Sequence, residues 1–567
     1  MNDPNGLVIS GPADNQTIHL YYQYNPEGLV AGNQHWGHAT TKSFESYKWE
    51  NHLPAIAPET GDNVGENAIF SGSAVIDSNN TSGFFNDTTE PENRIVAIYT
   101  LYTPDEQNQN VAYSTDGGYN YTKYESNPVL RNLGKYQTQF RDPKVFWDEA
   151  HSQWVMAVAH TQEYQVGFYT SPDLKTWNEA SRFGPAGVLG YQYECPALFQ
   201  APYVGGPQDG ETGWVLLISI NPGAIQGGSS TQYMFGDWDG KTFTPNDTVA
   251  RMADFGKDWY AAQTWDNVAE GKKPVVIGWA SNWQYTQQVP TSPWRSALSL
   301  PREIALKWSG YNPLNNGYLM AMTPFSTNAI AGDELVQNGG SNSSSSNSSN
   351  SSGDDDGNSD SDSSNSTSTS TSVSRNQTVS LTGDGAFEIR ANLSLTADAF
   401  ANATQETRIE FLVHASANGS DSGSSGNSSS SSSSSSGNNN SNYLVIGYLA
   451  GEQGAVYVDR RFAGGSWADS NPFFTDRFST HVQPLPSGND NDDSSNSDDD
   501  SSDMKFSLHM IVDRSITELF INEGRASAAV LHYWEDEAMP SSLEVKLGDG
   551  KVQIESLSVK PLASAWS

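Results

Sequence analysis

The chain has 567 residues, a formal net charge of −36 and a pI near 4.4. That length exceeds one ordinary hydrophobic core and predicts two domains together with non-globular segments. The acidic balance argues against nucleic acid and against an anionic membrane surface as partners. Part of the acidity falls in tracts rich in Ser, Asn and Asp, at 339–374, 417–441 and 486–503, which we expect to be disordered loops without a catalytic role.

The chain contains one cysteine, Cys195, so no intramolecular disulfide can form. No apolar run approaches the roughly 20 residues that span a bilayer. Acceptor triplets Asn-x-Ser/Thr are numerous and indicate a glycosylated, secreted protein. Because the chain opens directly on a motif, we expect a leader and a first strand upstream of Met1. The candidate glycosylation sites are Asn15, Asn80, Asn86, Asn120, Asn246, Asn376, Asn392 and Asn402.

Residues 1 to about 320 have the pattern of short strands separated by turns, with almost no helical periodicity. Each apolar run is bounded by Gly, Pro, Asn or Asp. The pattern predicts an all-β fold and leaves sandwich, barrel and propeller architectures open. Examples of the expected strands are Ile18–Tyr24, Arg94–Tyr102, Trp154–Ala159, Trp214–Ile220 and Val275–Ala280.

An internal repeat favours the propeller. An aromatic-ended strand, a turn and a second aromatic residue recur in Thr40–Trp49, Tyr113–Tyr119, Tyr169–Trp177 and Met234–Phe243. The spacing is long enough for one four-stranded blade with its loops, and the length of the region then predicts five blades. The alternative is that aromatic hairpins recur in any β protein.

From about 376 to 567 the chain shows cleaner period-2 strands, a pattern typical of a β-sandwich. We therefore predict a catalytic five-bladed β-propeller at 1–320, a linker with a disordered tract at 321–375, and a β-sandwich at 376–567 with inserts near 417–441 and 486–503. The expected strands are Ala386–Leu395, Thr407–His414, Tyr443–Leu449, Ala455–Asp459, Lys505–Val512, Thr517–Ile521 and Val552–Val559.

Two motifs place an aspartate directly before a proline. In Met-Asn-Asp-Pro-Asn-Gly at 1–6, Pro4 restricts Asp3 to an extended conformation, which fixes the direction of its side chain. In Phe-Arg-Asp-Pro at 140–143, Arg141 can keep the Asp142 carboxylate ionised. Taken alone, the first motif is an ordinary turn and the second a structural ion pair.

A third motif, Tyr-Glu-Cys-Pro-Ala-Leu-Phe at 193–199, places Glu194 among aromatic and apolar neighbours. Such surroundings favour the protonated carboxyl group that a general acid needs. The structural alternative is a Glu at a strand end bonded to backbone donors. With Phe70-Ser-Gly-Ser73 and Asp254-Phe-Gly-Lys257, the motifs recur at about the blade spacing, so in a propeller all five would line one central funnel.

Two carboxylates in unlike environments around one pocket are the apparatus of glycoside hydrolysis. Asp3, between two Asn residues, is expected to remain ionised and attack, and Glu194 to carry the proton for the leaving oxygen. Asp142 would hold substrate hydroxyls and stabilise the cationic transition state. Trp36, Phe70 and Trp283 suit stacking on a sugar face, although many Trp residues in a chain of this kind are core.

These motifs resemble those of glycoside hydrolase family 32, the invertases and inulinases. Tyr-Gln-Tyr-Asn-Pro at 22–26, His-Trp-Gly-His at 35–38 and Trp-Ala-Ser-Asn-Trp at 279–283 extend the likeness, which covers nearly the whole chain and is strongest to the fungal and yeast branch. The resemblance implies a five-bladed propeller with a β-sandwich and a retaining mechanism through a fructosyl-enzyme intermediate. The low-complexity inserts depart from the family pattern.

Carried over residue by residue, the resemblance implies Asp3 as nucleophile, Asp142 as transition-state stabiliser and Glu194 as acid/base. We expect a hydrolase that releases fructose from β-D-fructofuranosides such as sucrose and fructans. The sequence does not choose among sucrose, inulin and levan. The residues implied to bind the fructosyl unit are Asn2, Gln23, Trp36, Ser71, Arg141, Asp254, Lys257 and Trp283.

Two other functions stay open at this point. One is a fructosyltransferase that uses the same residues and passes the sugar to another sugar. The other is a non-catalytic carbohydrate-binding protein, against which three intact carboxylate motifs weigh. We expect no cofactor and no metal, because the ten His residues show no ligand spacing. The sandwich is a candidate contact for a homodimer.

Overall fold

The computed structural model describes residues 1–59, 67–309, 317–338, 377–417, 442–452, 454–482, 484–486, 503–535 and 538–564. Within them the chain is nearly all β, which confirms the predicted class. Most of the predicted low-complexity tracts and the glycosylation candidate Asn376 lie outside these residues. The described helical elements are short: α1 (Ala397–Ala401), α2 (Gly465–Ser470) and the 3₁₀ turns η1 (Phe44–Ser46), η2 (Pro91–Asn93), η3 (Thr161–Glu163) and η4 (Thr286–Gln288).

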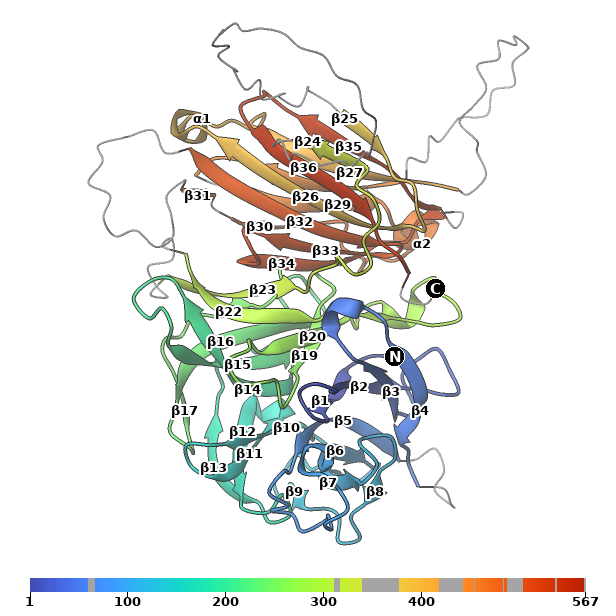
Figure 1. Cartoon of the computed structure of the whole chain (residues 1–567), viewed down its shortest axis with the longest axis vertical. Helices are drawn as coiled ribbons and strands as arrows, with labels where there is room; N and C mark the ends of the chain where they lie inside the picture. The colour runs from blue at the N-terminus through green and yellow to red at the C-terminus, as the bar shows by residue number, and fades with distance from the viewer. Residues whose placement is uncertain are drawn as a thin grey trace, which may run out of the picture.

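Three antiparallel sheets form in chain order from the first 183 residues (Figure 1). Strands that follow one another in sequence pair with one another, as short turns between them dictate. The first sheet has β1 (Pro4–Ser10), β2 (Thr17–Tyr24), β3 (His35–Thr41) and β4 (Glu50–Ile56). The second has β5 (Ala68–Ile76), β6 (Ile95–Tyr102), β7 (Gln107–Ser114), β8 (Thr122–Lys123) and β9 (Leu130–Arg131). The third has β10 (Phe140–Asp148), β11 (Gln153–His160), β12 (Gln165–Ser171) and β13 (Asn178–Phe183).

Two further antiparallel groups join into one ten-stranded sheet, because β14 and β22 pair in parallel at Tyr203–Leu306. The β23 strand runs past residue 320, so the predicted domain boundary falls inside a strand. The first group has β14 (Tyr193–Val204), β15 (Thr212–Ile220), β16 (Ser230–Trp238), β17 (Phe243–Pro245) and β18 (Arg251–Met252). The second has β19 (Tyr260–Thr264), β20 (Val275–Ala280), β21 (Ala297–Leu298), β22 (Arg302–Trp308) and β23 (Tyr318–Pro324).

The first strands of these five groups contact one another in cyclic order. β1 contacts β5, β5 contacts β10, β10 contacts β14, β14 contacts β19, and β19 contacts β1 again. The last contact includes backbone hydrogen bonds, from Asp266 N to Leu7 O at 2.9 Å and from Ile9 N to Asp266 O at 3.2 Å. The beginning of the chain is therefore bonded to the fifth group.

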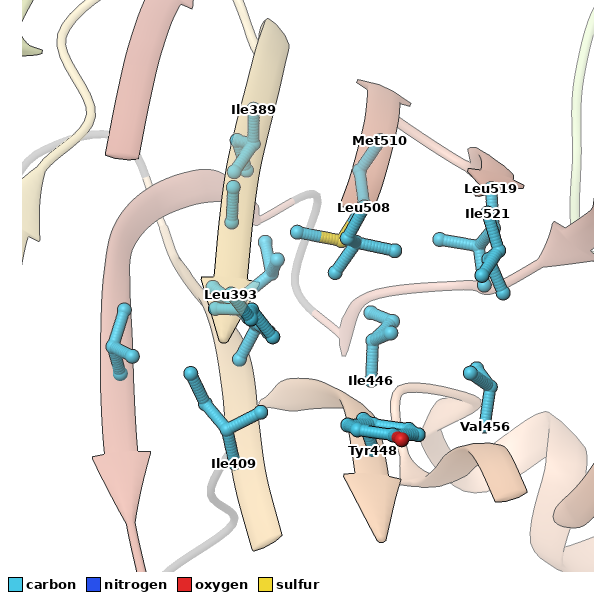
Figure 2. Close-up of a cluster of buried hydrophobic side chains, with 14 of the residues drawn as sticks. Ile389, Leu393, Ile409, Ile446, Tyr448, Val456, Leu508, Met510, Leu519 and Ile521 are labelled. Carbon is cyan, nitrogen blue, oxygen red and sulfur yellow. The ribbon is translucent and has the colours of Figure 1, made fainter. Parts of the chain in front are cut away.

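The remaining described strands form two sheets that share one hydrophobic core (Figure 2). Ile389, Met510 and Leu519 of one sheet face Ile409 and Ile446 of the other, as expected for period-2 strands. The seven-stranded sheet has β24 (Val336–Asn338), β26 (Ala386–Leu395), β31 (Leu485–Pro486), β32 (Met504–Asp513), β33 (Ile516–Ile521), β34 (Ala526–Leu531) and β36 (Gln553–Pro561). The six-stranded sheet has β25 (Gln377–Ser380), β27 (Arg408–Ser416), β28 (Tyr443–Leu449), β29 (Ala455–Phe462), β30 (Arg477–His481) and β35 (Met539–Leu547).

A buried arginine connects the two C-terminal sheets to the N-terminal part of the chain through ion pairs. The Arg302 guanidinium, 0% exposed, donates to Asp254 Oδ2 at 2.8 Å and to Glu518 Oε2 at 2.7 Å. Buried charges are tolerated when each is paired and hydrogen-bonded, as here. Asp254 lies between β18 and β19, whereas Glu518 belongs to β33 of the C-terminal sheets, so Arg302 joins the two parts at their junction.

A second buried arginine makes an equivalent link close by. Arg460 Nη1 donates to Asp258 Oδ2 at 2.7 Å, and its guanidinium lies 3.7 Å from the centre of the Phe474 ring. Asp258 also accepts hydrogen bonds from the Tyr285 hydroxyl and the Leu531 N–H. The two arginines fix the C-terminal sheets against the β19–β23 group. No helix among the described residues is long and apolar enough to cross a membrane.

Candidate active site

Each of the five first strands carries an irregularity near its beginning, next to the sequence motifs. A β-bulge leaves one residue unpaired and turns neighbouring side chains in a new direction, and bulges are common beside active sites. The backbone at Asp142, Cys195 and Ala261 adopts left-handed φ values of 65°, 47° and 52°. The register shifts lie between Asn5 and Val8, Ile69 and Gly72, Arg141 and Lys144, Glu194 and Ala197, and Tyr260 and Gln263.

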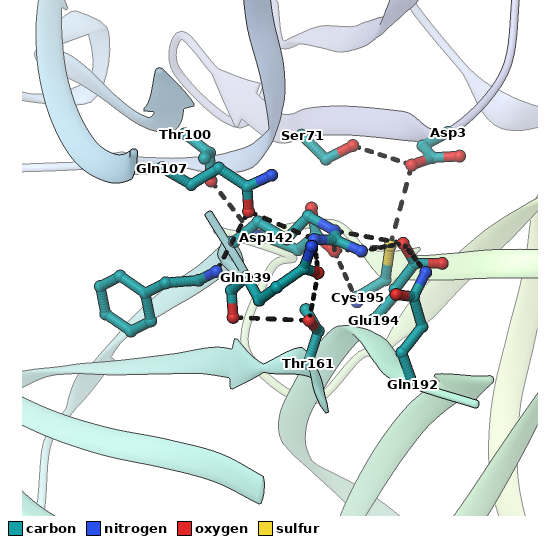
Figure 3. Close-up of polar contacts among 12 residues, drawn as sticks. Asp3, Ser71, Thr100, Gln107, Gln139, Asp142, Thr161, Gln192, Glu194 and Cys195 are labelled. Carbon is teal, nitrogen blue, oxygen red and sulfur yellow. Dashed lines mark hydrogen bonds and ion pairs between the residues drawn. The ribbon is translucent and has the colours of Figure 1, made fainter. Parts of the chain in front are cut away.

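These irregular strand ends bring three carboxylates together (Figure 3). Ser71 Oγ donates to Asp3 Oδ2 at 2.9 Å, and the N–H of Cys195 donates to Asp142 Oδ2 at 3.0 Å. The Cys195 sulfur lies 3.9 Å from Asp3 Oδ2 and 3.6 Å from Asp142 Oδ2. Glu194 is the neighbour of Cys195 on β14. Residues of β5, β10 and β14 therefore meet Asp3, which directly precedes β1.

Arg141 contacts Glu194 more closely than its sequence neighbour. Its Nη2 and Nε atoms lie 2.7 and 3.1 Å from Glu194 Oε1, whereas Nε is 4.0 Å from Asp142 Oδ2. Gln107 and Gln139 hold the remaining Nη1. Arg141 therefore has its closest carboxylate contact with Glu194, and it still favours the ionised form of Asp142, as expected.

The surroundings of Glu194 are polar, not apolar as its sequence neighbours suggested. Gln192 donates to Oε1 at 3.2 Å, and the buried Tyr260 hydroxyl donates to Oε2. Tyr193 is buried and its hydroxyl bonds to the backbone of Ala186, whereas Cys195 is buried among the carboxylates, with its sulfur near Asp3 and Asp142. The polar groups come from other strands and from Gln192, which the residues next to Glu194 in sequence do not reveal.

Burial changes the protonation of the groups around Glu194. Loss of water raises the pKa of Asp3 to about 6, with a further contribution from the negative charge of Glu194, while Ser71 and Asn2 act in the opposite direction. Burial also raises the pKa of Asp142, against the opposing effect of Arg141. Burial raises the pKa of the Cys195 thiol well above its ordinary value, so this sulfur stays neutral.

Comparison with known proteins identifies the family that carries this arrangement. The model of the glycosyl hydrolases family 32 N-terminal domain matches residues 1–316, and that of the family 32 C-terminal domain matches residues 345–561. The chain belongs to glycosyl hydrolase family 32. It is therefore a glycosidase.

Relatives and solved structures in family 32 match the chain along its whole length. An invertase of Wickerhamomyces anomalus is 37% identical and an extracellular exo-inulinase of Meyerozyma guilliermondii 34% identical, each over 99% of this chain and 92% and 93% of its own length. The structure of a β-fructofuranosidase from Schwanniomyces occidentalis complexed with fructosyl-erythritol superposes with a TM-score of 0.79 at 32% identity, covering 100% of this chain and 95% of that one.

Several predicted binding residues of the family 32 chain lie at the carboxylates. Asn2 donates to Asp3 Oδ1 at 3.2 Å, and Ser71 and Arg141 make the contacts described above. Asn2 and Trp283 also line a pocket beside Asp3, together with Trp279 and the 28–32 loop. The half-buried Trp283 packs on Trp279, with ring centres 4.9 Å apart. The three carboxylates are not among its lining residues, and Asn2 links the pocket to Asp3.

Three other predicted residues make their side-chain contacts with neighbouring protein groups and not with the carboxylates. Trp36 is 0% exposed and donates from its indole N–H to Phe70 O at 3.0 Å, so its ring has no free face for a sugar. Gln23 is also buried and donates to Ile69 O at 3.0 Å. Phe70 is half-buried and stacks on Tyr102 with centres 4.9 Å apart.

Asp254 and Lys257 are not brought to the carboxylates. Besides Arg302, Asp254 accepts hydrogen bonds from the N–H groups of Gly256 and Ala529. Lys257 Nζ donates to Phe473 O and Thr475 Oγ1, both at 2.7 Å. The two residues precede β19, and their side chains are bonded at the junction with the C-terminal sheets.

Tyr260 takes the fifth position that the sequence reasoning gave to Asp254. It begins β19 at the register shift and contacts Glu194. Tyr260 lies 66 residues after Glu194, a spacing close to that of the other motifs, so the repeat pointed to this part of the chain. Gln107, Gln139 and Gln192 were missed because glutamine carries no motif. In the described part of the chain no group of three His, Cys, Asp or Glu is arranged to hold a metal ion.

Proposed function

We propose that this family 32 chain is a retaining glycosidase that releases fructose from β-D-fructofuranosides, sucrose and fructans among them. The observation that carries the proposal is the meeting of Asp3, Asp142 and Glu194 at the ends of β1, β10 and β14. The related proteins named invertase and exo-inulinase, and solved structures holding fructose and fructosyl ligands, support the substrate class.

In the first step, an Asp3 carboxylate oxygen attacks the anomeric carbon of the fructosyl unit. The bond from that carbon to the glycosidic oxygen breaks, and Glu194 gives its proton to the leaving oxygen. In the second step, Glu194 takes a proton from water, whose oxygen displaces Asp3. Fructose leaves with its original anomeric configuration, and both carboxyl groups return to their starting states.

Asp142 and Arg141 serve the charge that develops between these steps. Asp142 sits in a left-handed conformation that costs energy for a residue with a Cβ, and such strain is typical of functional positions. Its buried carboxylate lies beside the forming cation, where it is worth more than in water. Arg141 holds Glu194 by two N–H groups and orients the acid/base.

We further propose the architecture expected from the sequence: a five-bladed β-propeller followed by a β-sandwich. The cyclic contacts of β1, β5, β10, β14 and β19 support five blades, and the core shared by the two C-terminal sheets supports a sandwich. The division at 1–320, 321–375 and 376–567 is proposed with it, with the boundary moved to the end of β23.

Secretion and N-glycosylation belong to the same proposal. The name of the extracellular exo-inulinase relative supports export. The side chains of Asn15, Asn86, Asn120, Asn246, Asn392 and Asn402 are exposed, and that of Asn80 is half-buried. The amide nitrogens of Asn80, Asn120, Asn392 and Asn402 donate to Phe85 O, Asp116, Ser556 and Asp398 respectively. A homodimer through the C-terminal sheets remains a proposal for measurement by light scattering.

The experiment that tests the function compares the wild type with Asp3→Asn and Glu194→Gln on sucrose, inulin and raffinose. We expect the wild type to release fructose from each, and each variant to lose about 100- to 10,000-fold in kcat. Product analysis at high sucrose separates hydrolysis from transfer to another sugar. Full activity in either variant would refute the assignment.

A further inference from the structure

A second pocket lies in the C-terminal half of the molecule, away from the carboxylates. It encloses about 280 Å³ and is lined by Trp467, Tyr533, Trp534 and Glu535, with the backbone at Gly464–Ser466 and with Pro290. Trp467 belongs to α2, and the 533–535 segment follows β34. No part of the proposed reaction uses these residues.

The aromatic wall of this pocket is held in place before any ligand arrives. The Trp467 ring meets the edge or face of Tyr285, Phe474 and Tyr533, with centres 6.2, 5.1 and 5.3 Å apart. The Trp534 indole N–H donates to Arg514 O at 2.6 Å. A pre-formed concave surface with rigid rings is what small-molecule sites require.

Two polar groups of this wall lack partners. Within the described residues, neither the Trp467 indole N–H nor the Tyr533 hydroxyl makes a hydrogen bond. Buried indole and phenol groups ordinarily find a partner, and Tyr533 is only 7% exposed, so the pair is suited to a ligand with hydroxyl groups. Ser466 adds an exposed hydroxyl, and its N–H donates to Glu535 Oε1 at 2.7 Å.

The charge of the wall argues for a neutral ligand. Glu535 supplies the one ionisable carboxylate among the lining residues, and no Lys or Arg lines the pocket. The chain itself carries a net charge of −36, which repels anions. Aromatic faces, hydroxyl-directed donors and a carboxylate acceptor together match a neutral saccharide, whose C–H faces stack on rings.

A single loop borders this pocket and the pocket beside Asp3. Pro290 lines the former, while Trp283, Gln287 and Arg295 line the latter. Trp294 on the same loop is 73% exposed. A polymer whose end is bound at the carboxylates can therefore continue over this loop towards Trp467.

We propose that the Trp467 pocket is a second saccharide site, which holds a distant part of a fructan chain while its end is cleaved. This inference rests on the proposed function for its choice of saccharide. It predicts that the pocket contributes to long substrates and not to sucrose, because a disaccharide cannot reach both places.

The test uses the full chain in two forms. In an Asp3→Asn background, which does not turn over, binding of inulin is measured by calorimetry with and without Trp467→Ala or Ser466→Arg, the second of which fills the pocket and spares its aromatic wall. We expect either change to weaken inulin binding about threefold to tenfold, the range of one stacking contact. Trp177→Ala, a half-buried tryptophan of the β12–β13 turn, is the matched control and should leave binding unchanged.

In the active background, the same substitutions should lower kcat/KM on long inulin by a similar factor and leave kcat/KM on sucrose within about twofold. Unchanged inulin binding in both folded variants would overturn the site, and binding of a soluble β-glucan in place of inulin would overturn the choice of fructan. If the wild type released no fructose from any substrate, the proposed function would fail, while the binding measurement would still decide the pocket.

Discussion

Glu194 receives different groups on its two oxygens, and this difference assigns the position of its proton. Oε1 accepts two N–H groups of Arg141 and one of Gln192, so it has no place for a proton. Oε2 faces only the Tyr260 hydroxyl among the described residues. A phenol both accepts and donates, so Tyr260 can accept from the protonated acid and donate to the carboxylate left after proton transfer.

Tyr260→Phe should therefore slow the step that needs the acid. We expect kcat on sucrose to fall about tenfold, the effect of one hydrogen bond to a charged group. An aryl fructoside with a good leaving group needs less proton donation and should lose much less. Equal losses on both substrates would mean that Tyr260 acts on packing alone.

Ser71→Ala should change the pH dependence of the nucleophile. The Ser71 hydroxyl stabilises the ionised form of Asp3 and so opposes the rise that burial causes, which leaves the pKa of Asp3 at about 6. Asp3 attacks only when ionised, so activity falls as the pH drops through this pKa. Removing the hydroxyl raises the pKa of Asp3 further, and the acid limb of kcat/KM should move to higher pH. A limb that stays in place or moves to lower pH would contradict the role of Asp3.

At this scale the sequence indicated the three carboxylates together with Asn2, Ser71 and Arg141, which contact them, but it did not indicate Tyr260, Gln107, Gln139 or Gln192. Asp3, Asp142 and Glu194 could be found because each stands beside a Pro or Cys-Pro pair that restricts the backbone. Trp36 and Asp254 were expected at the sugar, yet Trp36 is core and Asp254 is bonded to Arg302. Which side of a strand faces the pocket depends on the bulge, and bulges leave little trace in sequence.

At the scale of elements, the aromatic repeat corresponds to one recurring connection. Thr40–Trp49, Tyr113–Tyr119, Tyr169–Trp177 and Met234–Phe243 each join the third strand of a group to the fourth. The turns differ in length. The repeat therefore marks the same connection in each of the first four groups, and the fifth group lacks it.

A stack of buried histidines on β2 and β3 makes the first sheet sensitive to acid. His19 Nδ1 and His38 Nε2 are 3.1 Å apart, and burial lowers the pKa of His19 to about 3 and that of His38 to about 2. Below the ordinary value of 6.5 the unfolded chain binds protons that the folded chain refuses, so the free energy of unfolding falls as the pH falls.

His38→Phe should flatten this pH dependence. The ring keeps the stack on Tyr21, whose centre is 4.4 Å away, and removes one titrating group. Between pH 6 and pH 5, urea unfolding of the variant should lose about 1 kcal/mol less than the wild type, near the limit of 1.4 kcal/mol for one proton. An identical slope in both proteins would show that His38 titrates normally in the folded state.

At the scale of the whole molecule, Arg302 and Arg460 join the C-terminal sheets to the N-terminal part, which contains the three carboxylates. Arg302→Met should leave Asp254 and Glu518 buried without a cation, so we expect unfolding free energy to fall by about 3–5 kcal/mol. Arg461→Met, which breaks an exposed pair with Asp459, is the control and should have a much smaller effect. Similar losses of stability in both variants would show that the buried Arg302 ion pairs do not hold the two parts together.

At this scale, individual strands of the C-terminal sheets could be predicted from their period-2 pattern. Tyr443–Leu449 and Ala386–Leu395 were predicted with the bounds that the structure has. The junction could not be predicted, since Asp254 and Glu518 are 264 residues apart and a buried ion triad has no local pattern. Lys257 was expected at the sugar because its partners, Phe473 and Thr475, are likewise far from it in the sequence.

The central claim is that Asp3 becomes covalently bonded to fructose. Glu194→Gln, treated with an aryl fructoside that needs no acid, should accumulate this intermediate because its second step lacks a base. Mass spectrometry of the quenched protein should show the added mass of one fructosyl unit on the peptide that contains Asp3, and none when Asp3→Asn is added. An adduct on any other residue, or turnover with inversion of the anomeric carbon, would contradict the account.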